Sequence, residues 1–198
     1  MNRYKEIIKR LLDLAEKDEN IHAVVMIGSS TREYSKADEY SDIDIIIATK
    51  SPDEWLYGNN PEKLGEVKIS FIEPTLGGGK ERRILYNSSL DVDIIAFTPE
   101  QFKDAIINGV ANEVMNRGYS VLYDSMGISE LLKDHIQFKV THKIISEEEF
   151  INILNDFFFH VVWASKKILR GELWTAKMCI DSYLKNYLLK IIETYTLS

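Results

Sequence analysis

Cysteine is almost absent from this sequence. Cys179 is the only cysteine among 198 residues, so the chain cannot form an intramolecular disulfide, and such usage is typical of a reducing cytoplasm. The four histidines are scattered and, with a single cysteine, provide no spacing for a zinc site. The sequence also lacks an apolar run of about eighteen residues and an apolar core near its N-terminus, so we expect neither a membrane span nor a signal peptide.

Positive charge is also in short supply. The chain has 24 Lys and Arg residues against 31 Asp and Glu residues, which gives a formal net charge of −7. Proteins that bind nucleic acid need clustered basic residues to displace counterions, so this composition argues against a nucleic-acid partner. An acidic surface favours a cationic substrate, although acidity that serves only solubility is an open alternative.

Two apolar runs near the N-terminus are bordered by small or acidic residues. The first run, residues 24–27, is followed by Gly28 and Ser29. The second run begins with Asp42 and Asp44. Side chains two residues apart share one face of a strand, which places these carboxylates roughly 6–7 Å apart. Such a pair can bind divalent cations, and the Gly-Ser turn can offer N–H groups and a hydroxyl to a phosphate. The pattern predicts a site for a metal-bound nucleoside triphosphate, with a solvated strand start as the alternative for the two acids.

Hydrophobic periodicity predicts an α/β (α+β) fold followed by a helical region. Strands are expected over residues 22–27, 42–48, 65–73, 82–86, 90–97 and 118–124. Helices are expected over residues 4–16, from 52, over 99–108 and 128–134, and then over 150–169 and 173–194. We therefore predict an α/β domain over residues 1–135 and a helical domain over residues 136–198.

The last predicted helix has an unusual distribution of apolar residues. They cover most of its circumference, and a helix of this kind must be buried on several sides. The chain provides too little further sequence to bury it. We therefore expect the helical domain to be incomplete in this chain, or to be covered by a partner chain.

Two more acids, Asp91 and Asp93, share one face of a later predicted strand. With the Gly-Ser turn and the Asp-x-Asp strand, they complete the pattern of a two-metal phosphoryl-transfer site. Here the chain resembles the nucleotidyltransferase superfamily, and within it the aminoglycoside 6-adenylyltransferases that modify streptomycin. The closer likeness depends on the spacing from Gly28 to Asp42, on Asp91 after a hairpin and a leucine, and on the helix at residues 173–181.

The resemblance implies a fold and a first set of roles. The fold is the nucleotidyltransferase (DNA polymerase beta-like) mixed sheet with flanking helices, followed by a helical substrate-binding domain. Gly28 and Ser29 would hold the β- and γ-phosphates of ATP, and Asp42 and Asp44 would bind Mg²⁺. A hydroxyl in the position of Ser29 could also cap the following turn.

The resemblance also implies roles for later acids. The third family aspartate corresponds to Asp91 rather than Asp93, and it would ligate the catalytic metal or accept the proton of the attacking hydroxyl. The two residues could exchange these roles. Asp181 corresponds to an acid of the helical domain that faces the amino sugar, and an ordinary ion pair with Lys177 or Lys185 is the alternative.

One position departs from the family pattern. The family often has an arginine directly after Gly-Ser, whereas this chain has Ser30. Arg32 is the first candidate to supply the missing positive charge to the triphosphate. Lys80, Arg82 and Arg83, which follow a glycine-rich loop, are the others.

The expected activity follows from these implied roles. The chain would transfer AMP from ATP, with Mg²⁺ as cofactor, to a hydroxyl of a cationic aminoglycoside such as streptomycin, releasing pyrophosphate and conferring antibiotic resistance. We expect a cytoplasmic monomer or homodimer without nucleic-acid or membrane partners. A lincosamide or a protein side chain as acceptor, and a non-catalytic nucleotide-binding protein, are the alternatives.

Overall fold

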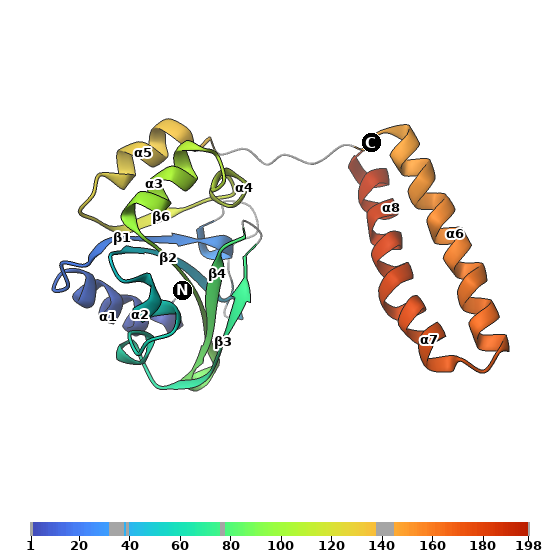
Figure 1. The fold of residues 1–198 in the computed structure, drawn as a ribbon, viewed down its shortest axis with the longest axis horizontal. Helices are drawn as coiled ribbons and strands as arrows, with labels where there is room; N and C mark the ends of the chain where they lie inside the picture. Colours follow the sequence, from blue (N-terminus) through green and yellow to red (C-terminus); the bar gives the residue numbers. More distant parts are fainter. Residues whose placement is uncertain (1, 32–37, 39, 76–77, 138–144, 198) are drawn as a thin grey trace. The chain divides into compact units, whose positions relative to one another are not determined.

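The computed structural model describes residues 2–31, 38, 40–75, 78–137 and 145–197. The chain divides into two compact units, Met1–Val140 and Thr141–Ser198 (Figure 1). The first unit holds a sheet and its helices, and the described part of the second unit is helical. The sequence predicts a domain boundary slightly earlier, after residue 135.

The first unit combines short helices with a six-stranded sheet. Its helices are α1 (Lys5–Ala15), α2 (Pro52–Leu56), α3 (Pro99–Ile107), α4 (Asn112–Met115) and α5 (Ile128–His135). Its strands are β1 (Ile21–Ile27), β2 (Ile43–Thr49), β3 (Val67–Pro74), β4 (Lys80–Tyr86), β5 (Leu90–Phe97) and β6 (Ser120–Asp124). Short 3₁₀ turns cover Asn2–Tyr4, Gly28–Thr31, Pro61–Lys63 and Asn87–Ser89.

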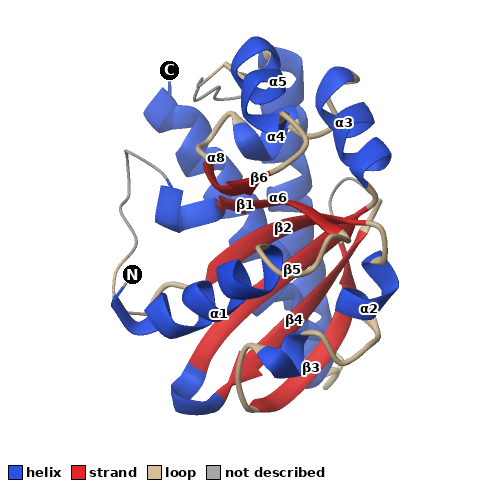
Figure 2. Cartoon of the chain, turned by 90° about the vertical axis from the view of Figure 1, so that its left-hand side faces the viewer, coloured by secondary structure: helices blue, strands red, loops and turns tan. Residues whose placement is uncertain are grey.

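The strands form one mixed sheet in the order β3-β4-β5-β2-β1-β6 (Figure 2). Strands β2 and β5 run parallel, and the other neighbouring pairs are antiparallel. Parallel neighbours need a long connection, and here this connection contains α2 and the β3–β4 pair. The α/β fold with a mixed sheet and flanking helices, predicted from the sequence, is confirmed.

Apolar side chains on the two faces of the sheet form two separate cores. One core packs residues of β2, β4 and β5 against α1 and α2, including Leu11 and Trp55. The other packs residues of β1 and β2 against α3 and α5, including Phe102 and Leu132. Figure 1 shows α3 and α5 on one side of the sheet and α1 and α2 on the other. Strand β2 is buried on both faces, which explains its nearly continuous apolar sequence.

The β3–β4 part of one sheet face lies outside this helical cover. Neither β3 nor β4 contributes a residue to the core beneath α3 and α5. Alternate residues of β3 and β4 stand on this face in register, and two of them, Ile69 and Phe71, are 59% and 54% exposed. The open sheet face is defined here by the side chains of Ile69, Phe71, Glu73, Glu81 and Arg83.

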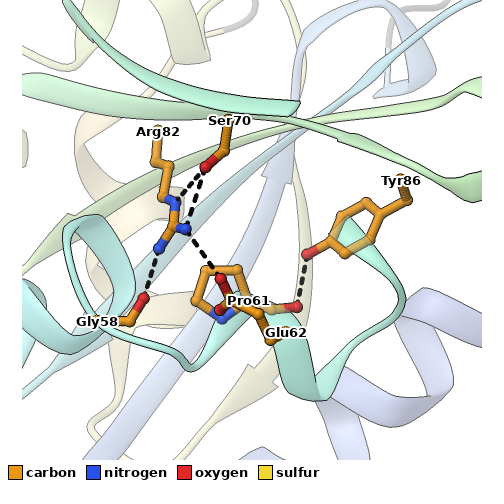
Figure 3. Close-up of polar contacts among 6 residues, drawn as sticks. All are labelled: Gly58, Pro61, Glu62, Ser70, Arg82 and Tyr86. Atoms are coloured by element: carbon orange, nitrogen blue, oxygen red, sulfur yellow. Dashed lines mark hydrogen bonds and ion pairs between the residues drawn. The ribbon is translucent and has the colours of Figure 1, made fainter. Parts of the chain in front are cut away.

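Side chains on the opposite face of β4 form hydrogen bonds with the segment that follows α2 (Figure 3). Arg82 is buried, and its guanidinium donates to the carbonyl of Gly58 (2.6 Å), to Ser70 Oγ (3.1 Å) and to Glu62 Oε1 (3.2 Å). The Tyr86 hydroxyl donates to the carbonyl of Pro61 at 2.9 Å. Arg82 is therefore a structural residue of the sheet and the adjoining turn.

The described part of the second unit is a helical hairpin. Helix α6 (Glu147–Leu169) begins at a capping box in which Ser146 and Glu149 exchange hydrogen bonds. It is followed by α7 (Leu173–Met178), a π-helical segment (Cys179–Leu184) and α8 (Lys185–Leu197). The sequence predicts one uninterrupted helix over residues 173–194, so the π-helical segment is a difference. Among the described helices, none is long and apolar enough to cross a membrane.

A polar cluster connects the two sides of this hairpin. Asp156 of α6 accepts hydrogen bonds from the hydroxyls of Tyr183 (2.9 Å) and Tyr187 (3.1 Å), and His160 Nδ1 lies 2.7 Å from the same carboxylate. A hollow of about 550 Å³ lies beside this cluster and is lined by aromatic and polar side chains of α6 to α8, among them Trp163 and Asn186. The cluster holds α6 and α8 together.

Candidate active site

The pairing of β1, β2 and β5 brings the sequence motifs together. In the parallel pair, Asp44 of β2 lies opposite Asp93 of β5. On the other side of β2, Asp44 lies opposite Ile27, the last residue of β1. The turn at Gly28 follows directly, so the glycine lies beside the Asp44 carboxylate.

Three carboxylates gather at this end of the sheet. Asp42, Asp44 and Asp93 each place one carboxylate oxygen within 4.8 Å of the others. Asp93 is 3% exposed, and the other two are half-buried. Carboxylates this close repel one another unless a proton or a cation offsets their charge. Oxygen ligands of this kind suit Mg²⁺.

The environment of Asp93 makes its ionised form costly. Burial raises the pKa of this carboxyl to about 7, Arg83 acts in the opposite direction, and Asp44 and Asp91 raise the pKa further. Oδ2 lies 3.3 Å from Arg83 Nε, whereas the buried Oδ1 has no hydrogen-bond partner among the described residues. A buried oxygen left in this state costs roughly 1–3 kcal/mol, and a cation bound to it would remove that cost.

The main chain at Gly28 passes very close to the Asp44 carboxylate. Gly28 has a φ of +78°, in the left-handed region that glycine adopts without strain. A Cβ atom here would lie 1.9 Å from Asp44 Oδ2. The Ser29 hydroxyl is buried without a partner among the described residues, so it caps no turn there. An unpaired hydroxyl and unpaired carboxylate oxygen beside a glycine turn together fit a cation bound next to a phosphate.

Tyr4 is a neighbour of the site that no sequence motif reveals. Its buried hydroxyl donates to the carbonyl of Ser41 at 3.0 Å and accepts from the N–H of Asp91 at 3.2 Å. It thereby ties the residue before Asp42 to the start of β5. The only sequence signal for Tyr4 is its position at the start of the first amphipathic helix.

Comparison with known families matches residues 1–197 to streptomycin adenylyltransferase. The chain belongs to the streptomycin adenylyltransferase family. A curated aminoglycoside 6-adenylyltransferase from Staphylococcus aureus is 23% identical over 214 residues, which cover 98% of this chain and 70% of that protein. A solved aminoglycoside 6-adenyltransferase from Bacillus subtilis is similar with a TM-score of 0.43 and 17% identity, covering 96% of this chain. This chain spans 65% of the length of that solved chain.

Membership in this family confirms the relationship to nucleotidyltransferases predicted from the Gly-Ser turn and the acids of two strands. Adenylyl transfer requires a nucleotide donor, and enzymes of phosphoryl transfer typically use a divalent metal. The three-carboxylate group is the place in the described residues where such a metal has suitable ligands.

The third acid of this group differs from the sequence prediction. The family pattern assigns the third position to Asp91, whereas the structure brings Asp93 next to Asp42 and Asp44. The reason is strand register, because Asp93 is the residue of β5 that lies opposite Asp44. Asp91 is exposed at the start of β5, where loss of solvent around the carboxyl and the nearby charge of Asp42 raise its pKa.

Asp181, the acid that the family resemblance places near the amino sugar, lies in the π-helical segment. Its carboxylate forms ion pairs with Lys177 and, at 3.0 Å, with Lys185, one helical turn before and after it. These are the ion pairs named as the alternative to a substrate-binding role. The role itself stays a prediction.

The basic residues that could supply a positive charge to the triphosphate differ in their positions relative to the carboxylate group. Arg32 lies outside the described residues. Arg82 is buried in the network on the far side of β4, and Lys80 donates to the hydroxyl of Tyr57 at 2.7 Å. Arg83 contacts Asp93, so it is the described candidate that stands beside the carboxylate group.

Proposed function

We propose that this chain transfers AMP from Mg·ATP to a hydroxyl group of a cationic aminoglycoside, with streptomycin as the first acceptor to test. The main support is the group of Asp42, Asp44 and Asp93 beside the Gly28 turn, in a chain that belongs to the streptomycin adenylyltransferase family. The net charge of −7 supports an acceptor of positive charge.

The residues of the site have distinct proposed roles toward the nucleotide. Asp42, Asp44 and Asp93 would hold Mg²⁺, which offsets the charge of the triphosphate and makes the α-phosphorus easier to attack. Because Gly28 has no Cβ, the Asp44 carboxylate lies directly against the main chain there, so a phosphate bound to the same cation would lie next to the Gly28 turn. The buried hydroxyl of Ser29 would donate to a phosphate oxygen.

Asp91 has the proposed role of general base. It is exposed, and it shares the strand face of Asp93. The acceptor oxygen attacks the α-phosphorus and forms a new P–O bond, while the bond to pyrophosphate breaks. The proton of the acceptor hydroxyl passes to the Asp91 carboxylate, which keeps the attacking oxygen nucleophilic.

The open sheet face is the proposed place for the acceptor. It combines exposed apolar groups, Ile69 and Phe71, with the half-buried carboxylates of Glu73 and Glu81, each of which pairs with Arg83 through one oxygen and has a second oxygen for a ligand. Aminoglycosides present ammonium or guanidinium groups on a ring framework. Carboxylates bind such groups through charge-assisted hydrogen bonds, and guanidinium groups of the kind that streptomycin carries can pair with them in a bidentate manner.

An acceptor panel tests the proposal. Purified protein is incubated with Mg·ATP and, in turn, streptomycin, other aminoglycosides, a lincosamide and a protein acceptor, and pyrophosphate release and product mass are measured. We expect release only with an aminoglycoside, and a product whose mass has increased by one AMP. Transfer to the lincosamide or the protein alone would overturn the proposed acceptor.

A variant pair tests whether the acids carry the activity. Asp44→Asn removes one proposed ligand and is expected to lower kcat at least about a hundredfold. Asp13→Asn makes the same chemical change at an exposed position of α1 and is expected to leave kcat unchanged. Equal rates for the two variants would contradict the proposed site.

A further inference from the structure

The triphosphate must approach a strongly acidic part of the protein. Three carboxylates form the proposed metal site, and Asp91, Glu73 and Glu81 stand on the same sheet face. A metal ion offsets only part of the combined charge of these acids and the nucleotide. The approach therefore needs a basic side chain close to the carboxylate group.

Two of the basic residues near the site are engaged elsewhere. The Arg82 guanidinium is buried on the opposite face of β4, where it contacts Gly58, Glu62 and Ser70. Lys80 Nζ lies 5.4 Å from the centre of the Tyr57 ring and donates to the Tyr57 hydroxyl.

Arg83 is placed differently. It lies opposite Asp93 in the antiparallel pair of β4 and β5, so the two side chains share the open sheet face. Its Nε lies 2.9 Å from Glu73 Oε2, 3.1 Å from Glu81 Oε1 and 3.3 Å from Asp93 Oδ2. The side chain remains 44% exposed, so it is accessible to a ligand on this face.

We propose that Arg83 contacts the triphosphate of Mg·ATP, and that Glu73 and Glu81 hold it in position for this contact. This inference rests on the proposed adenylyltransferase function.

The three contact distances of Arg83 support the view that it binds a phosphate and does not serve only as the ion-pair partner of Asp93. The two glutamates are closer to Nε than Asp93 is, so the side chain stays anchored when Asp93 turns to a cation. The terminal amino groups lie beyond Nε along the side chain. A guanidinium offers a planar fork of donors that matches phosphate oxygens, which a lysine ammonium cannot reproduce.

Equilibrium binding separates this role from a structural one. Wild type, Arg83→Gln and Arg83→Lys are titrated with Mg·ATP by calorimetry, and with Mn²⁺ alone by electron paramagnetic resonance. For Arg83→Gln we expect Mg·ATP affinity to fall at least about tenfold, because the donor fork is lost. Affinity for Mn²⁺ alone should stay equal or increase, because a positive charge beside the ligands is removed. Arg83→Lys should retain part of the Mg·ATP affinity.

A matched control and a kinetic readout complete the test. Lys68→Gln removes a basic side chain of β3 with similar exposure, 47%, that pairs with Glu66 on the surface, and it should bind Mg·ATP like wild type. In turnover, Arg83→Gln should raise the KM for ATP, and Lys68→Gln should leave that KM unchanged.

Two results would overturn the role of Arg83. Unchanged Mg·ATP affinity in Arg83→Gln would exclude the contact, and an equal loss of Mg·ATP and Mn²⁺ affinity with a lowered melting temperature would show a structural role. Either result leaves the proposed function standing as long as wild type binds Mg·ATP and Asp44→Asn abolishes transfer. Failure of wild type to bind Mg·ATP would instead reject the proposed function.

Discussion

At the scale of one residue, Gly28 leaves room for the Asp44 carboxylate, which a larger side chain would displace. Alanine at this position must adopt the left-handed φ of +78° and place a Cβ 1.9 Å from Asp44 Oδ2. The carboxylate would have to move. We expect Gly28→Ala to weaken Mn²⁺ binding at least about tenfold and to lower the free energy of unfolding by ~1–3 kcal/mol.

Gly127 provides a control for the strain alone. Its φ is +76°, and a Cβ there would meet nothing within 4 Å. Gly127→Ala should therefore lower the free energy of unfolding by about 1 kcal/mol and leave Mn²⁺ binding unchanged. Calorimetric titration and chemical denaturation measure both quantities. Wild-type Mn²⁺ affinity in Gly28→Ala would contradict the close fit described here.

The site could be predicted from the sequence only as far as its parts are local. Gly28, Asp42 and Asp44 are close in the chain, so their spacing predicts a site that includes all three. The choice between Asp91 and Asp93 depends on the register of β5 against β2, which are far apart in sequence. A shift of two residues would keep both acids on the same face and place Asp91 opposite Asp44 instead of Asp93, so periodicity cannot distinguish them.

At the scale of an element, the start of α5 is stabilised by the hydrogen-bonded carboxylate of Asp124. Asp124 Oδ1 accepts the N–H groups of Met126 and Ile128, and Oδ2 accepts the N–H and hydroxyl of Ser129. Burial raises the pKa of Asp124, but these hydrogen bonds outweigh it and lower the value to about 2. The stabilisation is therefore fully present above the unfolded-state pKa, near 4, and is lost as pH falls toward 2.

The substitution Asp124→Asn should remove the contribution of the ionised carboxylate to the free energy of unfolding. We expect a loss of about 1–2 kcal/mol in the free energy of unfolding at pH 7. The difference from wild type should shrink as pH falls from about 4 to 2, because wild-type Asp124 becomes protonated there. Urea denaturation across this range measures the effect. Asp134→Asn makes the same chemical change at an exposed position of the same helix and should have little effect on the free energy of unfolding at pH 7. A pH-independent difference for Asp124→Asn would refute this role of Asp124.

The bounds of an element could be predicted from the sequence where a turn or a proline marks its ends. Strand β5 occupies the predicted residues 90–97, because a turn with Ser88 and Ser89 at positive φ precedes it and Pro99 follows it. Helix α4 was not predicted, since four residues are too short to show helical periodicity. The π-helical segment was not predicted either, because one wider turn changes the apolar spacing of a long helix very little.

At the scale of the whole molecule, the two units differ in how much they bury. The first unit contains two cores that include large side chains such as Trp55 and Phe102. The buried apolar residues of the described second unit are Ala164, Ala176, Cys179 and Leu184. Many large apolar residues of this unit are exposed, including Phe158, Phe159, Trp174 and Tyr195.

This difference predicts unequal behaviour of the separated units. A fragment of residues 1–140 should unfold cooperatively in thermal circular dichroism, because both its cores are internal to it. A fragment of residues 141–198 should show a weak, broad transition, because an isolated hairpin with little buried area is marginal. A broad transition for the first fragment, or a sharp one for the second, would contradict this account. The expectation that further helices or a partner cover the helical unit stays a prediction.

The central claim is that Asp42, Asp44 and Asp93 form the metal site. Mn²⁺ binding by Asp93→Asn and Asp91→Asn, measured by electron paramagnetic resonance alongside wild type, tests it most directly. We predict that Asp93→Asn weakens Mn²⁺ binding at least about tenfold and that Asp91→Asn changes it little, since Asp93, unlike Asp91, belongs to the three-carboxylate group. Wild-type affinity in Asp93→Asn, or a larger loss in Asp91→Asn, would contradict it.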